Sequence, residues 1–167
     1  MKAQRMTQLA DALRSQLIRN FLEVPRERYE RKPLYDSLVG GVSNGTAAVK
    51  LGCGVDTVAP GKQSCPYHFH HAQEEMFIVL EGEGTLRVAG EMLPIKAGDV
   101  IFIPPGPEYP HHILNTSAAE LKYLSISTQE RPDVAEYPDS DKIGVFTKGP
   151  AFLQQRSSGL DYWTGEP

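Results

Sequence analysis

The histidines of this chain are confined to two short blocks, and this clustering constrains the fold more than any other feature. All five histidines of the 167-residue chain occupy positions 68, 70, 71, 111 and 112. Three imidazoles and one carboxylate, from His68, His70, Glu75 and His111, can bind one ion only if the chain brings the two blocks together. A β-barrel does this, so a metal site is the leading hypothesis.

The first block predicts a strand, a turn and a second strand. His68 and His70 are two residues apart and therefore share one face of an extended strand. Glu75 lies an odd number of residues beyond His70, so alternation alone would turn it to the opposite face. A short turn at Ala72 and Gln73 would let Glu75 begin a facing strand and rejoin the two histidines.

The second block predicts a chain reversal followed by an extended segment. The apolar run 100–103 is followed by Pro104-Pro105-Gly106, a sequence typical of a turn. Pro110 favours extended geometry just before His111, which is the fourth ligand candidate. Alternation turns the adjacent His112 away from that side, and the alternative that His112 is the fourth ligand stays open.

The two blocks resemble the paired motifs of the cupin superfamily, small antiparallel barrels that usually hold a divalent metal. The first motif, His-x-His followed by Glu and then Gly, is matched by His68, His70, Glu75 and Gly82; the second is matched by Gly98, Pro104, Gly106, His111 and Asn115. Two departures occur: Gly61 lies one residue too far upstream, and the gap from Gly106 to His111 is two residues longer than usual. The resemblance implies a double-stranded β-helix, or jelly-roll, barrel with His68, His70, Glu75 and His111 as metal ligands.

The ligand types narrow the choice of metal. Imidazole and carboxylate together favour one divalent transition metal over calcium, and the candidates are Fe, Mn, Ni, Zn and Cu. Four protein ligands on an octahedral ion would leave two adjacent positions for substrate, whereas the same four would close a tetrahedral zinc site. The identity of the metal therefore bears on whether the chain is a catalyst.

Composition and periodicity predict an all-β fold with an amino-terminal amphipathic helix. The chain has 13 prolines and 15 glycines between short apolar runs, which indicates many strands and tight turns. At the amino terminus, apolar residues recur every three or four positions, and Glu23 and Pro25 mark the expected end of a helix. Its apolar stripe, which must be buried against something, consists of Met6, Leu9, Leu13, Leu17 and Phe21.

The expected organisation is one domain with two extensions. Residues 1–45 comprise the helix and a connecting arm, with 26–32 as a solvated connection; residues 46–130 form the barrel; and residues 131–167 form an irregular arm that packs on it. Strands are expected at 35–39, 46–59, 74–80, 84–89, 100–103, 111–114 and 121–127. The runs 74–80 and 100–103 are apolar on both faces, so either the helix or another subunit covers them, and a homodimer is predicted.

Charge and cysteine content limit the partners. The net charge of −4, with no basic cluster, argues against nucleic acid and against a membrane surface. No stretch is apolar enough to span a bilayer, and a cytoplasmic location is expected. Cys53 and Cys65 lack a paired spacing and are expected to be reduced, small buried side chains.

Three functions from different classes fit the sequence. The first is a metalloenzyme that acts on a small polar substrate, as a sugar or hydroxy-acid isomerase, epimerase or lyase. The second is a metal-dependent dioxygenase, and the third is a non-catalytic module that binds a small molecule. The segment 132–139 resembles the tail of bacterial single-domain cupins named as sugar-phosphate isomerases, although a family name does not fix a reaction.

Two further expectations concern the substrate. Arg87 alternates with Leu86 and Val88 and is expected to face solvent, which argues against a phosphorylated substrate. The candidates for an acid or base near the site are Glu81, Tyr67 and Tyr109. For the two tyrosines, packing at the rim of the barrel is the simpler interpretation.

Overall fold

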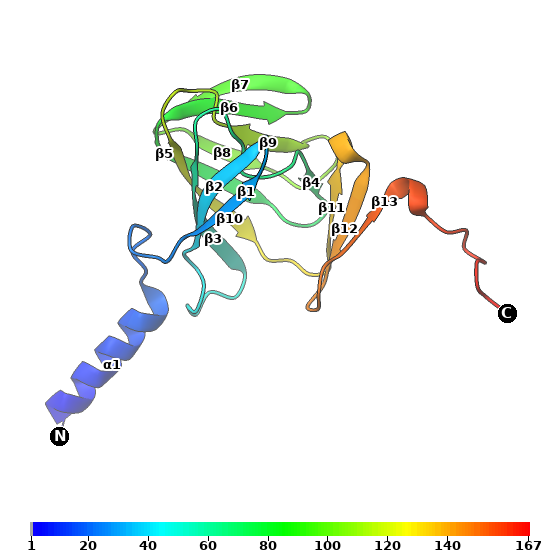
Figure 1. The fold of residues 1–167 in the computed structure, drawn as a ribbon. Helices are drawn as coiled ribbons and strands as arrows, with labels where there is room; N and C mark the ends of the chain where they lie inside the picture. Colours follow the sequence, from blue (N-terminus) through cyan, green and yellow to red (C-terminus); the bar gives the residue numbers. More distant parts are fainter. Residues whose placement is uncertain (1) are drawn as a thin grey trace.

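The computed structural model describes residues 2–167, with side chains from Met6 onward, as one helix followed by a β-barrel (Figure 1). The helix and the strands that precede the second histidine block are α1 (Lys2–Leu17), β1 (Glu27–Arg31), β2 (Tyr35–Gly41), β3 (Leu51–Val58), β4 (Phe69–His70), β5 (Glu75–Glu81), β6 (Glu83–Val88), β7 (Glu91–Lys96) and β8 (Val100–Ile103). The strands that follow are β9 (His111–Leu114), β10 (Leu121–Thr128), β11 (Asp133–Tyr137), β12 (Lys142–Phe146) and β13 (Phe152–Gln155).

The strands form antiparallel sheets that enclose one interior. The largest sheet has the order β1-β2-β3-β10-β5-β8, and smaller sheets have the orders β7-β6-β9 and β13-β12-β11-β4. Consecutive strands pair in hairpins, but other neighbours are distant in sequence: β10 lies between β3 and β5, and β9 pairs with β6. This crossed order is typical of a jelly roll, and the predicted all-β jelly-roll barrel with an amino-terminal helix is confirmed.

Alternation along the strands separates the core from the surface as predicted. On β5, Phe77 and Val79 are buried, whereas Met76 and Ile78 alternate with them and are half-buried. The apolar core consists of Val58, Phe77, Val79, Leu86, Ile95, Ile103, Ile113, Leu121 and Tyr123. These residues come from the six-stranded sheet and from the sheet β7-β6-β9, which face each other across the core. Their burial fixes the strand register that positions the site.

All seven predicted strands are present, but the sequence missed others. The strand expected at 46–59 begins at Leu51, because a turn occupies its first residues. The Thr46 hydroxyl holds this turn by donating to the carbonyl of Ser43 at 2.7 Å. Strand β1 forms where a solvated connection was predicted, and its residues are exposed as that prediction requires. Strand β7 was not predicted.

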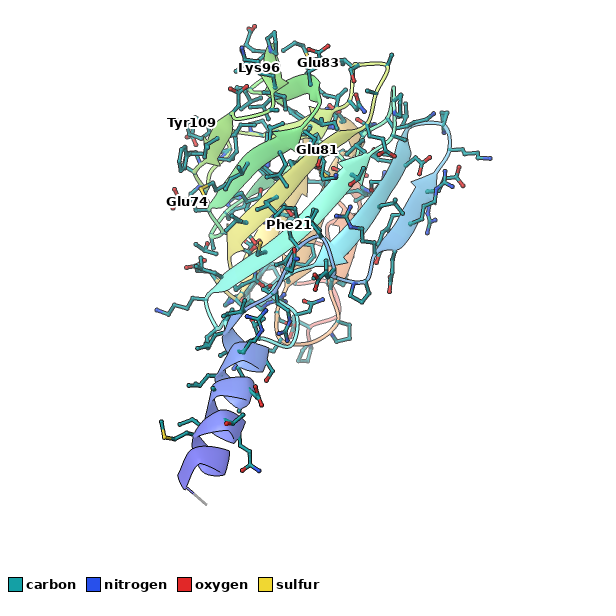
Figure 2. All side chains as sticks on the ribbon, turned by 90° about the vertical axis from the view of Figure 1, so that its left-hand side faces the viewer. Phe21, Glu74, Glu81, Glu83, Lys96 and Tyr109 are labelled. Atoms are coloured by element: carbon teal, nitrogen blue, oxygen red, sulfur yellow. The ribbon has the colours of Figure 1, made fainter. Side chains whose placement is uncertain are left out.

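Helix α1 ends at Leu17, earlier than the predicted end near Glu23. Beyond it, the side chain of Asn20 accepts a hydrogen bond from the backbone N–H of Leu22 at 3.0 Å, a local bond that competes with helix continuation. Most of the apolar stripe does not pack on the barrel: Met6, Leu9, Leu13 and Leu17 are exposed, from 45% at Leu13 to 65% at Met6, and Phe21 alone is half-buried. Figures 1 and 2 both show α1 pointing away from the sheets. Among the described residues, no helix has the length and apolar character needed to cross a membrane.

The carboxyl-terminal arm packs on the barrel, but it is not irregular as predicted. Strands β11, β12 and β13 form consecutive antiparallel pairs, and β11 also pairs with β4, where Ala135 lies opposite His70. Proline and glycine in the arm mark turns between these short strands rather than a lack of structure. The arm therefore reaches the first histidine block.

Candidate metal centre

Four of the side chains singled out from the sequence converge inside the barrel. The ligand atoms of His68, His70 and Glu75 all lie within 4.8 Å of one another. Glu75 Oε2 is 3.9 Å from His68 Nε2, 3.8 Å from His70 Nε2 and 2.9 Å from His111 Nε2. One carboxylate oxygen thus faces the same ring nitrogen of three imidazoles.

Backbone pairing between the two histidine blocks produces this convergence. The backbone N–H of His68 donates to the carbonyl of His111 at 3.1 Å, and the backbone N–H of His111 donates back at 2.7 Å. The predicted turn separates His70 from Glu75, and β5 begins at Glu75. The carbonyl of His70 accepts a hydrogen bond from the N–H of Gly106 at 2.8 Å, so the Pro-Pro-Gly turn contacts the first block directly.

The other ring nitrogen of each histidine has a fixed partner. His68 Nδ1 donates to the carbonyl of Pro66 at 2.9 Å, and His111 Nδ1 donates to the carbonyl of Tyr109 at 3.1 Å. His70 Nδ1 contacts Asp133 Oδ2 at 2.6 Å. Because carbonyls and carboxylates accept hydrogen bonds, these contacts place the proton on Nδ1 and leave each Nε2 lone pair directed at the centre.

Asp133 is a site residue that the sequence analysis missed. Its side chain is fully buried, and its second oxygen accepts a hydrogen bond from the backbone N–H of Ala72 at 3.0 Å. One carboxylate therefore orients His70 and also holds the turn that leads to Glu75. The alternation of the segment 133–137 was the available signal that this part of the arm is a strand.

Charge and burial at the centre favour ligand-ready protonation states. Burial, reinforced by the nearby His111, lowers the pKa of His68 to about 4, so its imidazole is neutral at pH 7. Burial alone would raise the pKa of Glu75, but the hydrogen-bonding contact with His111 and electrostatic interactions with the surrounding imidazoles hold that pKa below its ordinary value. Neutral imidazole and ionised carboxylate are the forms that bind a metal.

Three of the four candidate ligands are partly exposed, and the fourth is buried. The side chains of His68, Glu75 and His70 are 13%, 14% and 17% exposed, whereas His111 is 1% exposed. The ring of Tyr137, from the arm, stacks on His68 with centroids 5.9 Å apart. The partly exposed ligands thus lie in the first histidine block and at the start of β5, and the arm contacts the first of these ligands.

The remaining histidines and Asn115 lie away from the centre. His71 contacts Glu136 on the half-exposed outside of the barrel at 2.9 Å. His112 is buried on the outer side of β9, where its ring meets Tyr67 edge-on, so the structure places His111 and not His112 beside Glu75. Asn115 holds a turn as predicted, donating to the carbonyls of Val58 and Ala119.

The candidate acids and bases named from the sequence are not at the centre. Glu81 is exposed and paired with Lys122, and Tyr109 is exposed at the edge of the molecule (Figure 2). The hydroxyl of Tyr67 accepts a hydrogen bond from the N–H of Gly90 at 3.0 Å. These side chains have structural partners elsewhere.

Arg87 was expected to face solvent, and the structure corrects this in part. It points out of the barrel, but the arm covers it: its guanidinium lies 3.8 Å from the Tyr67 ring centre and pairs with both oxygens of Asp139. The prediction that Arg87 points out of the barrel is therefore confirmed, whereas the sequence did not predict that the arm would cover it. Arg87 remains outside the interior.

The two cysteines are free and half-buried, in agreement with the expected reduced state. Burial raises the pKa of Cys65 to about 12, so its thiol stays protonated. A protonated thiol is a poor metal ligand, which leaves the imidazoles and the carboxylate as the donor set.

The donor set fits a divalent transition metal. Glu75 Oε2 and His111 Nε2 are buried, and neither has a hydrogen-bond partner, although they are 2.9 Å apart. Buried polar atoms without partners are uncommon in native proteins, and a shared cation would satisfy both. The cluster of His68, His70 and Glu75 could hold such an ion.

Comparison with known proteins agrees with this geometry. The cupin domain family matches residues 54–127. Auxin-binding protein 1 of Arabidopsis thaliana is 32% identical over 133 residues, which are 74% of this chain and 64% of that protein. An uncharacterized protein of Methanocaldococcus jannaschii is 32% identical over 97 residues, 58% of this chain and 70% of its own. The oxalate-binding protein of Thermotoga maritima is 37% identical over 67 residues, 40% of this chain and 54% of its own.

Two solved structures share the architecture over most of the chain. One is an Acidithiobacillus ferrooxidans protein with a provisional name as a sugar phosphate isomerase; it has a TM-score of 0.78 and 26% identity, and the match covers 89% of this chain and 97% of that one. A cupin from Silicibacter pomeroyi named as a sugar phosphate isomerase has a TM-score of 0.76 and 19% identity, with 87% and 97% covered. The second likeness supports the fold alone.

Proposed function

This chain belongs to the cupin family, and from that premise we propose that it is a metalloenzyme acting on a small polar substrate. The side chains of His68, His70, Glu75 and His111 bind one divalent transition metal. The substrate is a sugar or hydroxy acid, and the reaction is of the isomerase, epimerase or lyase type.

The convergence of His68, His70 and Glu75, together with His111 Nε2 at 2.9 Å from Glu75 Oε2, carries this proposal. A structural hydrogen-bond network would give each buried nitrogen and oxygen a partner, yet Glu75 Oε2 and His111 Nε2 have none. In addition, all three histidines have Nδ1 fixed by an acceptor. This arrangement of anchored imidazoles around free Nε2 atoms is what metal ligation requires.

The residues of the chain define what the site can do. When bound, the metal would act as a Lewis acid toward adjacent substrate oxygens. Asp133 holds the Nδ1 proton of His70 and so keeps its Nε2 basic. The ring of Tyr137 narrows the entrance beside His68, which favours a small substrate. Because the imidazole of His68 is neutral, it does not repel a cation at the site.

A second candidate is a non-catalytic module that binds a small carboxylate. The names of two relatives, an auxin-binding and an oxalate-binding protein, favour it. The same donor set would hold the metal, and a carboxylate ligand would bind to it. Turnover distinguishes this candidate from the enzyme, because a binding module returns every ligand unchanged.

The dioxygenase alternative depends on the identity of the metal. An oxygenase requires a redox-active ion, and iron suits a site of histidines and a carboxylate. Elemental analysis that finds zinc would therefore reject this alternative, because Zn²⁺ has no redox chemistry.

We also propose that the chain forms a homodimer. Apolar side chains remain exposed on both α1 and the outer face of β8, including Leu9, Leu17 and Phe102. Exposed apolar surface on this scale is typical of an interface. A second copy of the chain would cover both regions at once, since a C2 interface uses the same patch twice.

Metal content tests the proposed function. Protein purified without a chelator or affinity tag is expected to hold about one transition-metal ion per chain, and His70→Ala to lose most of it while the fold persists. His71→Ala is the matched control, because the neighbouring imidazole points outward to Glu136. Equal metal content in the two variants would reject the site assignment.

A further inference from the structure

The interior of the barrel contains a second polar cluster, beyond the metal centre. Asp56 on β3 is 8% exposed and faces inward opposite Tyr123 of β10, which in turn lies opposite Val79 of β5. The ring of Phe77 lies between the cluster and the metal centre, with its centroid 5.8 Å from that of Tyr123 and 5.7 Å from that of His111. The cluster and the centre therefore share one interior.

The cluster is made of hydroxyls around one carboxylate. The Ser125 hydroxyl donates to Asp56 Oδ2 at 3.0 Å, and the hydroxyls of Tyr123 and Ser64 are 2.6 Å apart. Ser37 on β2 is a diagonal neighbour of Asp56 on the same face, because Ser37 lies opposite Val58. Its hydroxyl is buried and has no hydrogen-bond partner.

Small residues line the inner face of β3 and β10 beside the cluster. Along the inner face, Gly54 lies opposite Ser125 and Gly52 lies opposite Ser127. All four positions are half-buried although they face inward, so the interior is not filled there. A Cβ atom at Gly54 would lie 2.9 Å from the Ser125 hydroxyl, which shows how closely a larger side chain would crowd the cluster.

The charge of Asp56 is not offset by a cation within the interior face described above. The charge of Arg26 lowers the pKa of Asp56 slightly. Its guanidinium, however, donates to the hydroxyl of Thr57, which alternates with Asp56 and lies on the opposite face of β3. Burial raises the pKa of Asp56 to about 6, so the carboxylate is ionised at neutral pH. A buried carboxylate that retains acceptor capacity is costly for the fold alone, and a ligand that donates hydrogen bonds would offset that cost.

Tyr123 connects the two polar regions electrostatically. Burial raises its pKa well above the ordinary value, and the charges of both Asp56 and Glu75 add to that increase. The phenol therefore lies within range of both carboxylates. On the same face of β10, Ser125 follows Tyr123 and Ser127 follows Ser125, and Ser127 lies opposite Glu75, so polar side chains continue from the cluster to the metal centre.

We propose that Asp56, Ser125, Tyr123 and Ser64 form a hydroxyl-binding subsite for the neutral polyol chain of the substrate. This inference rests on the proposed function, because the oxygen-bearing end of the same substrate is placed at the metal centre. The carboxylate accepts hydrogen bonds from substrate hydroxyls, and the serine and tyrosine hydroxyls both donate and accept. The negative charge of Asp56 disfavours a phosphate or second carboxylate at this end of the substrate. The substrate class is accordingly an unphosphorylated sugar acid or sugar.

Matched ligands test the subsite in the full-length, metal-loaded protein. Lactate carries the hydroxy-acid end alone, whereas tetronates, pentonates and hexonates add a polyol chain. Titration calorimetry is expected to show that at least one of these sugar acids binds wild type about tenfold more tightly than lactate. Asp56→Ala is expected to remove most of this preference, since a hydrogen bond to a charged group contributes about tenfold or more, and to leave lactate affinity unchanged.

Two variants keep the test specific. Asp36→Ala makes the same change on the adjoining strand, at a position that faces outward and pairs with Arg28, and it is expected to retain the preference. Asp56→Asn preserves side-chain volume and neutral hydrogen bonding, so it is expected to lose part of the preference even if Asp56→Ala fails to fold.

The outcomes separate this proposal from the proposed function. If no sugar acid binds wild type more tightly than lactate, or if the preference survives Asp56→Asn and Asp56→Ala, the subsite is overturned. If removal of the metal leaves lactate affinity unchanged, the metal-centre proposal fails instead. Loss of the preference in the Asp56 variants, with metal content unchanged, supports the subsite.

Discussion

The amino-terminal helix and the carboxyl-terminal arm both extend the barrel, but only the arm contacts the metal centre. Helix α1 has the more regular sequence pattern, yet its apolar stripe is exposed and it points away from the sheets. The arm reads as irregular, yet Asp133 orients His70 and the Tyr137 ring stacks on His68. A regular apolar pattern in the sequence of a segment thus predicts its local structure, but it does not predict whether the segment contacts the site.

The largest expected effect is at Asp133. Replacement of Asp133 by Asn leaves an amide that cannot hold the His70 proton as a carboxylate does, and metal affinity is expected to fall about 10- to 100-fold. Competition with a chromogenic chelator measures this affinity. Asp161→Asn, an exposed position in the same arm, is the control, and an equal loss there would refute a specific role for Asp133.

Substitutions in helix α1 should leave metal affinity unchanged and alter the oligomeric state instead. Leu9→Asp with Leu13→Asp places two charges on the exposed stripe and is expected to convert the dimer to monomer, while metal content stays at the wild-type level. Light scattering coupled to size-exclusion chromatography reports the mass. Replacing Gln8 and Asp11 by Ala, between the stripe positions, serves as control. A monomeric wild type would overturn the proposed pairing.

The smallest expected effect is at the ion pair that fastens the arm. Arg87→Ala removes the contacts with Asp139 and with the Tyr67 ring and is expected to lower the free energy of unfolding by about 1 kcal/mol at pH 7, because the pair is partly exposed. Urea unfolding measures this difference.

The same ion pair has a predicted pH dependence. The hydrogen bond from Arg87 lowers the pKa of Asp139 below its ordinary value of 3.8. Because the folded protein lowers the pKa of this carboxyl, the ionised group stabilises the fold at pH values above 3.8. That stabilisation is lost as the pH falls through the lowered pKa of the folded state. The difference between wild type and Arg87→Ala should therefore shrink below pH of about 4. A difference that grows on acidification would contradict this assignment.

The sequence predicted the parts of the fold and site that depend on local pattern. Alternation placed Phe77 and Val79 in the core, and the two-residue spacing of His68 and His70 put both on one face. The bend before Glu75 followed from its odd spacing. These inferences need only the geometry of a strand and its turn.

The remaining parts depend on contacts between distant segments. Asp133 meets His70 because β11 pairs with β4, and no local pattern around either residue specifies that partner. The covering of Arg87 by the arm has the same origin. Asp56 was missed for a different reason, since its meaning comes from the inward register of β3 against β10 and not from a motif.

The hydrogen bond between His70 and Asp133 spans 63 residues of sequence. All four proposed ligands precede Asp133 in the chain, so they are synthesised before the carboxylate that orients one of them. An ion that met an unfinished barrel would find a His70 ring with no partner at Nδ1. If the centre holds a metal as proposed, its full affinity therefore waits for β11 to pair with β4, and the last strands to be made complete the first histidine block.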